Sequence, residues 1–195
     1  MKEYFSKAYN NPFRWRSYLE QINYALDLKP KSVLYVGVGN GLIPNYLSHF
    51  CKVETLDIDK KCKPTYLGDV KNISKKINKK YDVIICCQVL EHVSFKYFSQ
   101  ILKQFKKISR KVILSIPHSA WHFRNEFIIG KKAFRSNFSI PIPKKYNGFH
   151  KWEIGRDKLT KKRVRKSIKE DFNILIEKGL AYNPYYRFYV LEVKK

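Results

Sequence analysis

Residues 33–47, VLYVGVGNGLIPNYL, carry the pattern that decides the fold. An apolar, β-branched run stops at Gly37, Gly39 and Gly41, and apolar residues then resume with helical spacing. Glycine lets the backbone turn sharply and approach a ligand where a side chain would block it, and the first N–H groups of a helix can bind that ligand. The stretch predicts a strand, a ligand-binding loop and a helix, although ordinary strand–helix packing also uses such turns.

An acidic residue at the end of the next strand-like run favours a nucleotide ligand. Asp57, in VETLDID, follows Gly37 by about twenty residues, where folds of this kind place a carboxylate that binds ribose hydroxyls. The dinucleotide fingerprint would need a third glycine at position 42, which is Leu42, and no G-K-[ST] follows the loop. These differences disfavour NAD and a phosphate cradle for ATP or GTP.

Further motifs follow in an order that resembles class I S-adenosylmethionine (SAM) methyltransferases of the small type-11-like group. The segments that carry the resemblance are GVGNG (37–41), VETLDID (53–59), TYLGDV (65–70), YDVIICCQVLEHV (81–93) and RKVILSIP (110–117). The resemblance is clear from about residue 13 to 117 and weaker beyond. It implies that the chain is an enzyme and that SAM is its cofactor.

The fold class expected is α/β, with a Rossmann-like, seven-stranded, mainly parallel sheet, a C-terminal antiparallel hairpin and helices on both faces. We expect strands at 32–37, 52–57, 65–68, 81–87, 110–116, 171–177 and 186–193. Helices are expected within 15–28 and at 41–49, 71–79, 94–108 and 156–169. Residues 1–195 are expected to form one domain, with an N-terminal helical cap (1–30) and an acceptor-side insertion (118–155).

The resemblance also implies which residues bind the cofactor. They are Gly37, Gly39, Gly41, Asp57, Ile58, Asp69, Val70 and Gln88. Asp57 would bind the ribose hydroxyls and Asp69 the adenine amino group. Asp69 is equally expected as the cap of a helix beginning at Lys71, and Gln88 as a residue that merely ends a strand. Asp59 is expected to start a helix, and Glu91 and His92 are commonly structural in this fold.

The acceptor side of the site is assigned to the long segment between Pro117 and Gly155, which is too aromatic for disorder. We expect it to enclose an acceptor pocket. The substrate-contact candidates are Trp121, His122, Trp152 and Glu153. The candidates for the catalytic base are His118 first and His150 second, although either histidine has packing or loop hydrogen bonding as an alternative role. No H-E-x-x-H-like spacing occurs, so no metal site is expected.

The composition leaves the partner open. The chain has 40 Lys and Arg against 16 Asp and Glu, a net charge of +24, which attracts phosphate backbones and anionic lipid. The lysines are spread over several segments, however, and the richness in Lys, Ile and Asn is typical of an AT-rich genome. Four cysteines without C-x-x-C spacing indicate reduced thiols. With no signal peptide and no apolar run of bilayer length, a cytoplasmic location is expected.

The function expected is SAM-dependent methyl transfer to an O or N atom of a small molecule, such as a glycosyl unit or a metabolite. An RNA- or protein-directed methyltransferase that uses the basic surface is the alternative, and a non-catalytic SAM-fold binding module is a further one. The fourth strand ends in CCQV. It lacks the Asn/Asp-Pro-Pro-aromatic tetrapeptide of enzymes that methylate amino groups of DNA and many of RNA, and the Pro-Cys or Thr-Cys of pyrimidine-C5 enzymes.

Overall fold

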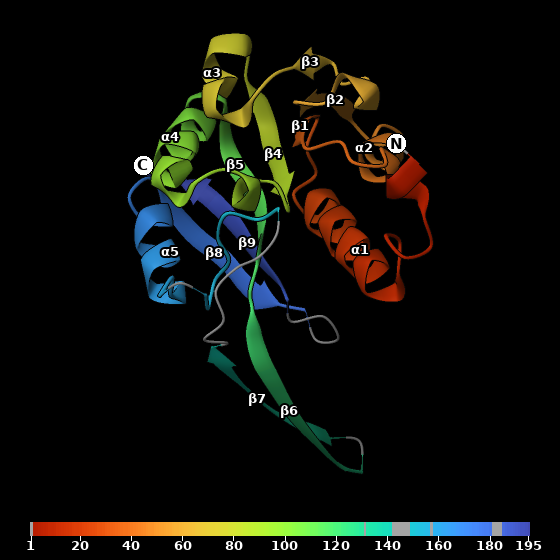
Figure 1. The fold of residues 1–195 in the computed structure, drawn as a ribbon, viewed down its shortest axis with the longest axis vertical. Helices are drawn as coiled ribbons and strands as arrows, with labels where there is room; N and C mark the ends of the chain where they lie inside the picture. Colours follow the sequence, from red (N-terminus) through yellow and green to blue (C-terminus); the bar gives the residue numbers. More distant parts are fainter. Residues whose placement is uncertain (1, 131, 142–148, 157, 181–184) are drawn as a thin grey trace.

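The computed structural model describes residues 2–130, 132–141, 149–156, 158–180 and 185–195. A seven-stranded sheet with the strand order β3-β2-β1-β4-β5-β9-β8 forms its centre (Figure 1). Its strands are β1 (Ser32–Val36), β2 (Lys52–Asp57), β3 (Tyr66–Leu67), β4 (Tyr81–Cys87), β5 (Ser109–Pro117), β8 (Phe172–Gly179) and β9 (Tyr186–Val193). The first five strands pair in parallel, and β9 is antiparallel to both β5 and β8. The expected fold class is confirmed.

The central strands are continuous apolar runs because helices cover both faces of the sheet. In β1, Leu34 and Val36 pack toward one core, whereas Val33 and Tyr35 pack toward the other. The register aligns Val33 with Val53 of β2 and Val83 of β4. The carboxyl ends of the parallel strands therefore meet at one edge, where open α/β sheets bind ligands.

Two groups of helices form the outer layers (Figure 1). The helices α1 (Pro12–Asp27) and α2 (Leu42–Leu47) lie on one face. The helices α3 (Ile73–Lys76), α4 (Phe98–Ile108) and α5 (Lys161–Ile168) lie on the other. Short 3-10 helices are η1 (Lys2–Phe5), η2 (Lys60–Cys62), η3 (Val70–Asn72), η4 (Leu90–His92) and η5 (Phe95–Tyr97). The described helices are all too short or too polar to cross a membrane.

Side-chain caps mark where α1 and α5 begin. The Asn11 side chain accepts a hydrogen bond from the Arg14 N–H at the start of α1, so this helix begins before the expected range. Thr160 caps α5 in the same way, and Val164 and Ile168 are fully buried as its spacing predicts. The helix expected at 71–79 is only one 3-10 turn followed by the short α3, and the turn expected at 183–184 lies outside the described residues.

The insertion contains two strands that the sequence analysis did not place. The strands β6 (Ala120–Ile129) and β7 (Lys132–Pro141) form a separate antiparallel sheet, joined by a turn in which Gly130 has φ +59°. This ribbon projects away from the seven-stranded sheet (Figure 1). The expectation of an insertion that encloses a pocket is therefore wrong for these twenty-odd residues, whose alternating apolar and polar side chains are typical of a strand.

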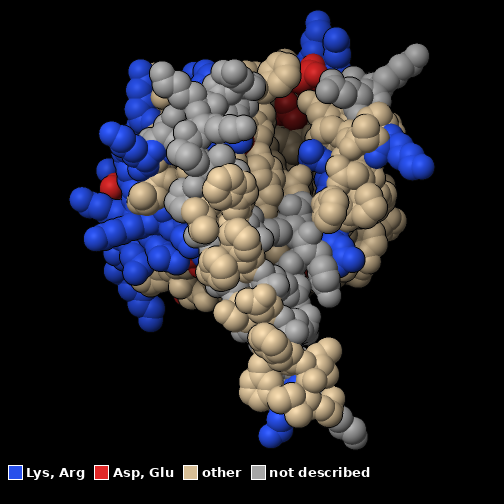
Figure 2. Space-filling model, turned by 60° about the horizontal axis from the view of Figure 1, so that its bottom comes forward, with Lys and Arg blue, Asp and Glu red and all other residues tan. Residues whose placement is uncertain are grey.

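The projecting ribbon has one exposed apolar face. Cross-strand partners share a face of the ribbon, and Trp121 pairs with Ile140, Phe123 with Phe138, and Phe127 with Phe134. All six are exposed, and the Phe123 and Phe138 rings stack with centroids 4.7 Å apart. On the face seen in Figure 2, the described side chains of this arm are mostly uncharged.

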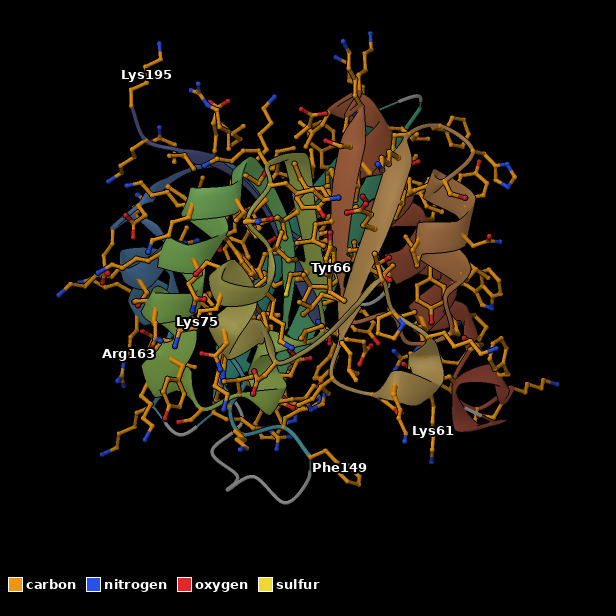
Figure 3. All side chains as sticks on the ribbon, turned by 90° about the horizontal axis from the view of Figure 1, so that it is seen from above. Lys61, Tyr66, Lys75, Phe149, Arg163 and Lys195 are labelled. Carbon is orange, nitrogen blue, oxygen red and sulfur yellow. The ribbon has the colours of Figure 1, made fainter. Side chains whose placement is uncertain are left out.

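Charged side chains are distributed around the rest of the molecule. In Figure 3, Lys61, Arg163 and Lys195 lie on different parts of the outline of the molecule. The acidic Glu177 of β8 is held between two of the basic residues, because it accepts hydrogen bonds from Arg165 Nε at 2.5 Å and from Arg187 Nε at 2.6 Å. Burial alone would raise the pKa of Glu177, but the two guanidinium groups outweigh it and lower that pKa.

Candidate active site

The glycine loop after β1 leaves no room for a side chain at its first position. Gly37, Gly39 and Gly41 all have positive φ, at +84°, +57° and +74°. A Cβ on Gly37 would lie 2.3 Å from Cγ2 of Val89, whereas a Cβ on Gly41 would meet nothing within 4 Å. The loop therefore brings its backbone close to the end of β4, and Gly41 begins α2 in the left-handed conformation.

Asp57 lies directly beside this loop at the end of β2. Its Oδ2 accepts a hydrogen bond from the Val38 N–H at 2.7 Å, and its Oδ1 accepts one from the Asp59 N–H at 2.9 Å. A carboxylate has about four acceptor positions, so these two bonds orient the group and leave capacity for ligand hydroxyls. Figure 2 looks onto this edge of the sheet, where acidic side chains lie deep in a hollow.

The other residues expected at the cofactor have mixed surroundings. Asp69 caps η3 through the Lys71 N–H at 2.8 Å and forms an ion pair with Lys71 Nζ at 3.1 Å. Val70 packs in the core and Ile58 is 72% exposed. Gln88 has φ +56° and donates from Nε2 to Ser115 Oγ at 3.2 Å. Asp59 caps η2 as expected.

The N-terminal segment packs against the glycine loop through side chains that the sequence analysis did not single out. Asn40 donates to Asn10 Oδ1 at 3.0 Å and to the Tyr18 hydroxyl at 3.2 Å, and its own Oδ1 accepts from the Leu42 N–H. A groove of about 810 Å³ opens between α1 and α2 on this side, and Gly41 lines it. Asp57 does not line this groove.

A second group of polar residues gathers where the insertion returns to the sheet. Glu153, 3% exposed, receives a hydrogen bond from Tyr185 at 2.9 Å and another from Ser119, and it pairs with Arg156 at 3.1 Å. Its Oε1 lies 2.8 Å from His150 Nδ1. Burial would raise the pKa of Glu153, but these donors outweigh it and lower the pKa, so the carboxylate is ionised and His150 donates from Nδ1.

Glu91 and His92 of η4 approach His150 from the opposite side. Glu91 Oε1 lies 4.0 Å from His150 Nε2, and the two histidine rings meet edge to face with centroids 4.8 Å apart. Glu91 is completely buried, which raises its pKa to about 8. Burial and the neighbouring His150 lower the pKa of His92. The sequence analysis treated Glu91 and His92 as structural and did not link them to His150, from which they are separated by more than fifty residues.

The remaining acceptor-side candidates are not gathered in one pocket. His118 is 4% exposed directly after β5, and its backbone N–H donates to the Tyr185 carbonyl oxygen at 2.7 Å. Trp121 is 56% exposed on the ribbon, and the side chain of His122 lies outside the described part of the structure. Trp152 is a core residue, 5% exposed, that packs against Phe95 and Phe98.

Comparison with known proteins agrees with this architecture. A family model described as a methyltransferase domain matches residues 9–156. No curated protein matches the sequence significantly. The fold is similar to that of the glycopeptide N-methyltransferase MtfA, solved with S-adenosylhomocysteine, at a TM-score of 0.60 and 13% identity over 90% of this chain and 89% of MtfA.

Two further solved structures have related folds. The magnesium protoporphyrin IX methyltransferase ChlM from Synechocystis PCC 6803, solved with SAM, gives a TM-score of 0.61 at 16% identity over 93% of this chain and 80% of ChlM. The ribosomal protein L11 methylase from Lactobacillus delbrueckii subsp. bulgaricus gives 0.53 at 13% identity over 91% and 77%. The acceptors named for these proteins differ, so the shared fold does not identify an acceptor. The chain belongs to the methyltransferase domain family and has the fold of the class I SAM-dependent methyltransferases.

Proposed function

We propose that the protein transfers a methyl group from SAM to an O or N atom of a small-molecule acceptor. The observation that carries this proposal is the glycine loop packed against Val89 with the Asp57 carboxylate fixed beside it, at the carboxyl edge of the sheet. Both features suit a ligand that has hydroxyl donors and that approaches the backbone closely.

The residues of this edge fit SAM. Asp57 is oriented by two backbone N–H groups and retains acceptor capacity for two ribose hydroxyls. Asp69 has the remaining acceptor capacity to bind an amino group. Ile58 directly follows Asp57 and Val70 directly follows Asp69, so their backbone groups lie next to the two carboxylates in the chain. Gln88, held by Ser115, would contact the methionine part.

SAM supplies a methyl group already activated as a sulfonium, so the protein has to align the acceptor and remove its proton. His118 and His150 remain the candidates for this proton transfer, since the His118 backbone N–H donates to Tyr185 and the His150 ring contacts both Glu153 and Tyr185. Glu153 would orient His150 rather than contact the acceptor, because its oxygens are occupied by four neighbours. Trp152 would support the pocket from the core, and Trp121 would contact acceptors from the base of the ribbon.

One observation favours the macromolecular alternative: basic side chains gather on the left side of the view in Figure 2. A nucleic-acid ligand needs a contiguous basic surface of this kind. A small acceptor is favoured by glycopeptide and porphyrin, which are named for two of the structural neighbours, whereas a ribosomal protein is named for a third. The four free cysteines fit a reducing, cytoplasmic compartment.

Titration calorimetry with SAM and S-adenosylhomocysteine tests the proposal. The wild type should bind both, and Asp57→Asn should weaken binding by about 10- to 100-fold, because hydrogen bonds to a charged acceptor contribute roughly 1.5–3 kcal/mol. Asp59→Asn is the matched control, since Asp59 only caps η2, and should keep the affinity within about 2-fold. No SAM binding by the folded wild type would refute the proposal.

Labelled SAM and fractionated cell extract then identify the acceptor. Label in a small-molecule fraction supports the proposed acceptor class. Label in RNA or protein, with binding that weakens steeply as salt rises, would replace it with the macromolecular alternative.

A further inference from the structure

We propose that Glu91, His92 and His150 bind a divalent transition-metal cation at the edge of the acceptor site. One ligand atom of each side chain lies within 4.8 Å of the others. Two imidazoles and one carboxylate are a ligand set typical of Zn²⁺, Co²⁺, Fe²⁺ or Mn²⁺. His92 is exposed and His150 partly so, which gives a cation a path from solvent.

The hydrogen bonds around the two histidines prepare them as ligands. His150 donates from Nδ1 to the ionised Glu153, and His92 Nδ1 lies 3.3 Å from the Phe149 carbonyl oxygen, which can only accept. In both rings the proton is thereby placed on Nδ1, and Nε2 keeps the lone pair. In most metal sites, the ring nitrogen of a histidine ligand that does not bind the metal donates its N–H to a carboxylate or a backbone carbonyl.

The state of Glu91 is the independent observation that indicates a missing cation. Its side chain is 0% exposed, and neither carboxylate oxygen accepts a hydrogen bond from another residue of the described segments. Burying a carboxyl group without a partner is costly, and such a group calls for an explanation. The carboxylate faces His150 Nε2 at 4.0 Å, so a cation between them would supply the absent partner.

The spacing fits a site that closes slightly when the metal binds. Two ligand atoms at about 2.1 Å from Zn²⁺ in tetrahedral geometry lie roughly 3.4 Å apart, so the three ligands would have to approach one another by roughly 1 Å. Rotation of the exposed His92 can provide most of this movement. Three protein ligands leave at least one coordination position for an exogenous oxygen.

This inference rests on the proposed function and narrows its acceptor to a hydroxyl compound. An acceptor hydroxyl at the open position would become more acidic, as water does on a bound metal. The O–H proton would pass to His118 or to water, and the acceptor oxygen would form a bond to the methyl carbon while the methyl–sulfur bond breaks. S-adenosylhomocysteine and the methyl ether are the products, so charge and atoms balance. In this scheme His150 is a ligand, and His118 remains the candidate base.

Cobalt binding to the full-length protein, freed of metal with a chelator and of any affinity tag, tests the site without relying on activity. Wild-type protein should bind one equivalent of Co²⁺, with a visible d–d absorption band and a heat signal in calorimetry. Glu91→Gln and His150→Asn should each weaken Co²⁺ binding at least about 10-fold. His49→Asn, which removes an exposed histidine far along the chain from the cluster, is the matched control and should bind as the wild type does.

The outcomes separate the metal site from the proposed function. Equal Co²⁺ affinity in wild type and Glu91→Gln, or no binding by the wild type, would overturn the site, whether or not SAM binds. Co²⁺ binding without SAM binding would keep the site and refute the proposed function. Circular dichroism checks that each variant folds, and Co²⁺ should raise the unfolding temperature of the wild type but not of Glu91→Gln.

Discussion

Replacing Gly37 by alanine tests whether the glycine loop is built around close packing against the end of β4. The new Cβ would lie 2.3 Å from Val89 Cγ2, and the residue would keep a φ of +84°. Left-handed backbone costs a non-glycine residue about 1–2 kcal/mol, and overpacking adds about 1–3 kcal/mol. We therefore expect Gly37→Ala to lower the free energy of unfolding by about 2–5 kcal/mol.

Gly41→Ala separates the two costs. Its φ is +74°, but nothing lies within 4 Å of its added Cβ, so only the backbone cost of about 1–2 kcal/mol applies. Val89→Ala tests the overlap from the other side, because it removes Cγ2 and leaves the Val89 Cβ at 3.7 Å, an ordinary contact. The double variant Gly37→Ala/Val89→Ala should therefore be more stable than the sum of the two single changes by about 1–3 kcal/mol.

Urea unfolding followed by circular dichroism and tryptophan fluorescence gives the four free energies of this cycle. The packing argument fails if Gly37→Ala costs no more than Gly41→Ala. It also fails if the changes at Gly37 and Val89 add within about 0.5 kcal/mol. Under either result, the loop's glycine would serve its backbone conformation alone.

Three further changes probe other parts of the molecule. The pKa of Glu177 is lower in the folded than in the unfolded protein, so its ionised carboxylate stabilises the fold above the unfolded pKa, and this stabilisation is lost as the pH falls through the folded pKa. Between about pH 6 and about pH 3, the wild type should therefore lose more free energy of unfolding than Glu177→Gln in urea titrations. Parallel pH curves for the two proteins would contradict this. Trp152→Phe should lower the free energy of unfolding by about 1–3 kcal/mol in the same assay. The change removes the Nε1–H donor and leaves the Leu90 and Val93 carbonyl oxygens, now 3.1 and 2.7 Å from Nε1, without that hydrogen bond. An unchanged unfolding midpoint would refute this contribution of Trp152 to stability. Replacing residues 122–139 of the ribbon with Asn-Gly should change the melting temperature by no more than ~3 °C and leave the SAM affinity unchanged, because β6 and β7 pair only with each other. Loss of SAM binding in calorimetry would instead show that the ribbon contributes to the proposed SAM site.

The central sheet was predictable because each of its strands carries a local signal. Burial on both faces makes the runs around Val33, Val83 and Val112 continuously apolar, and the glycine loop and the acidic strand ends punctuate them. The helix expected at 71–79 was shortened because Asp69 caps a 3-10 turn first and the chain leaves helical geometry at Ile77. Boundaries of this kind depend on caps and tertiary contacts rather than on periodicity.

The insertion was harder to interpret for two different reasons. Its aromatic content indicates order and suggests the wall of a pocket, whereas the alternation in AWHFRNEFII and KAFRSNFSIP is the pattern of the two strands that form. The three residues of the proposed metal site have no characteristic sequence spacing, because Glu91 and His92 follow β4 whereas His150 follows the ribbon. Parallel strands bring such distant loops to one edge only after the sheet has formed.

The packing at the end of β4 ties the two halves of the candidate site together. Val89 fills the space beside Gly37, and two residues later Glu91 turns its carboxylate toward His150. The loop proposed to hold the methyl donor and the cluster proposed to activate the acceptor are therefore supported by one short segment, residues 88–92. A methyl transfer needs donor and acceptor aligned to within a fraction of an ångström. Gln88 in the same segment has a left-handed backbone, with φ +56°, and two hydrogen bonds to Ser115 hold it there. Strained backbone of this kind is often found where a site must be positioned accurately, which agrees with the alignment that methyl transfer needs.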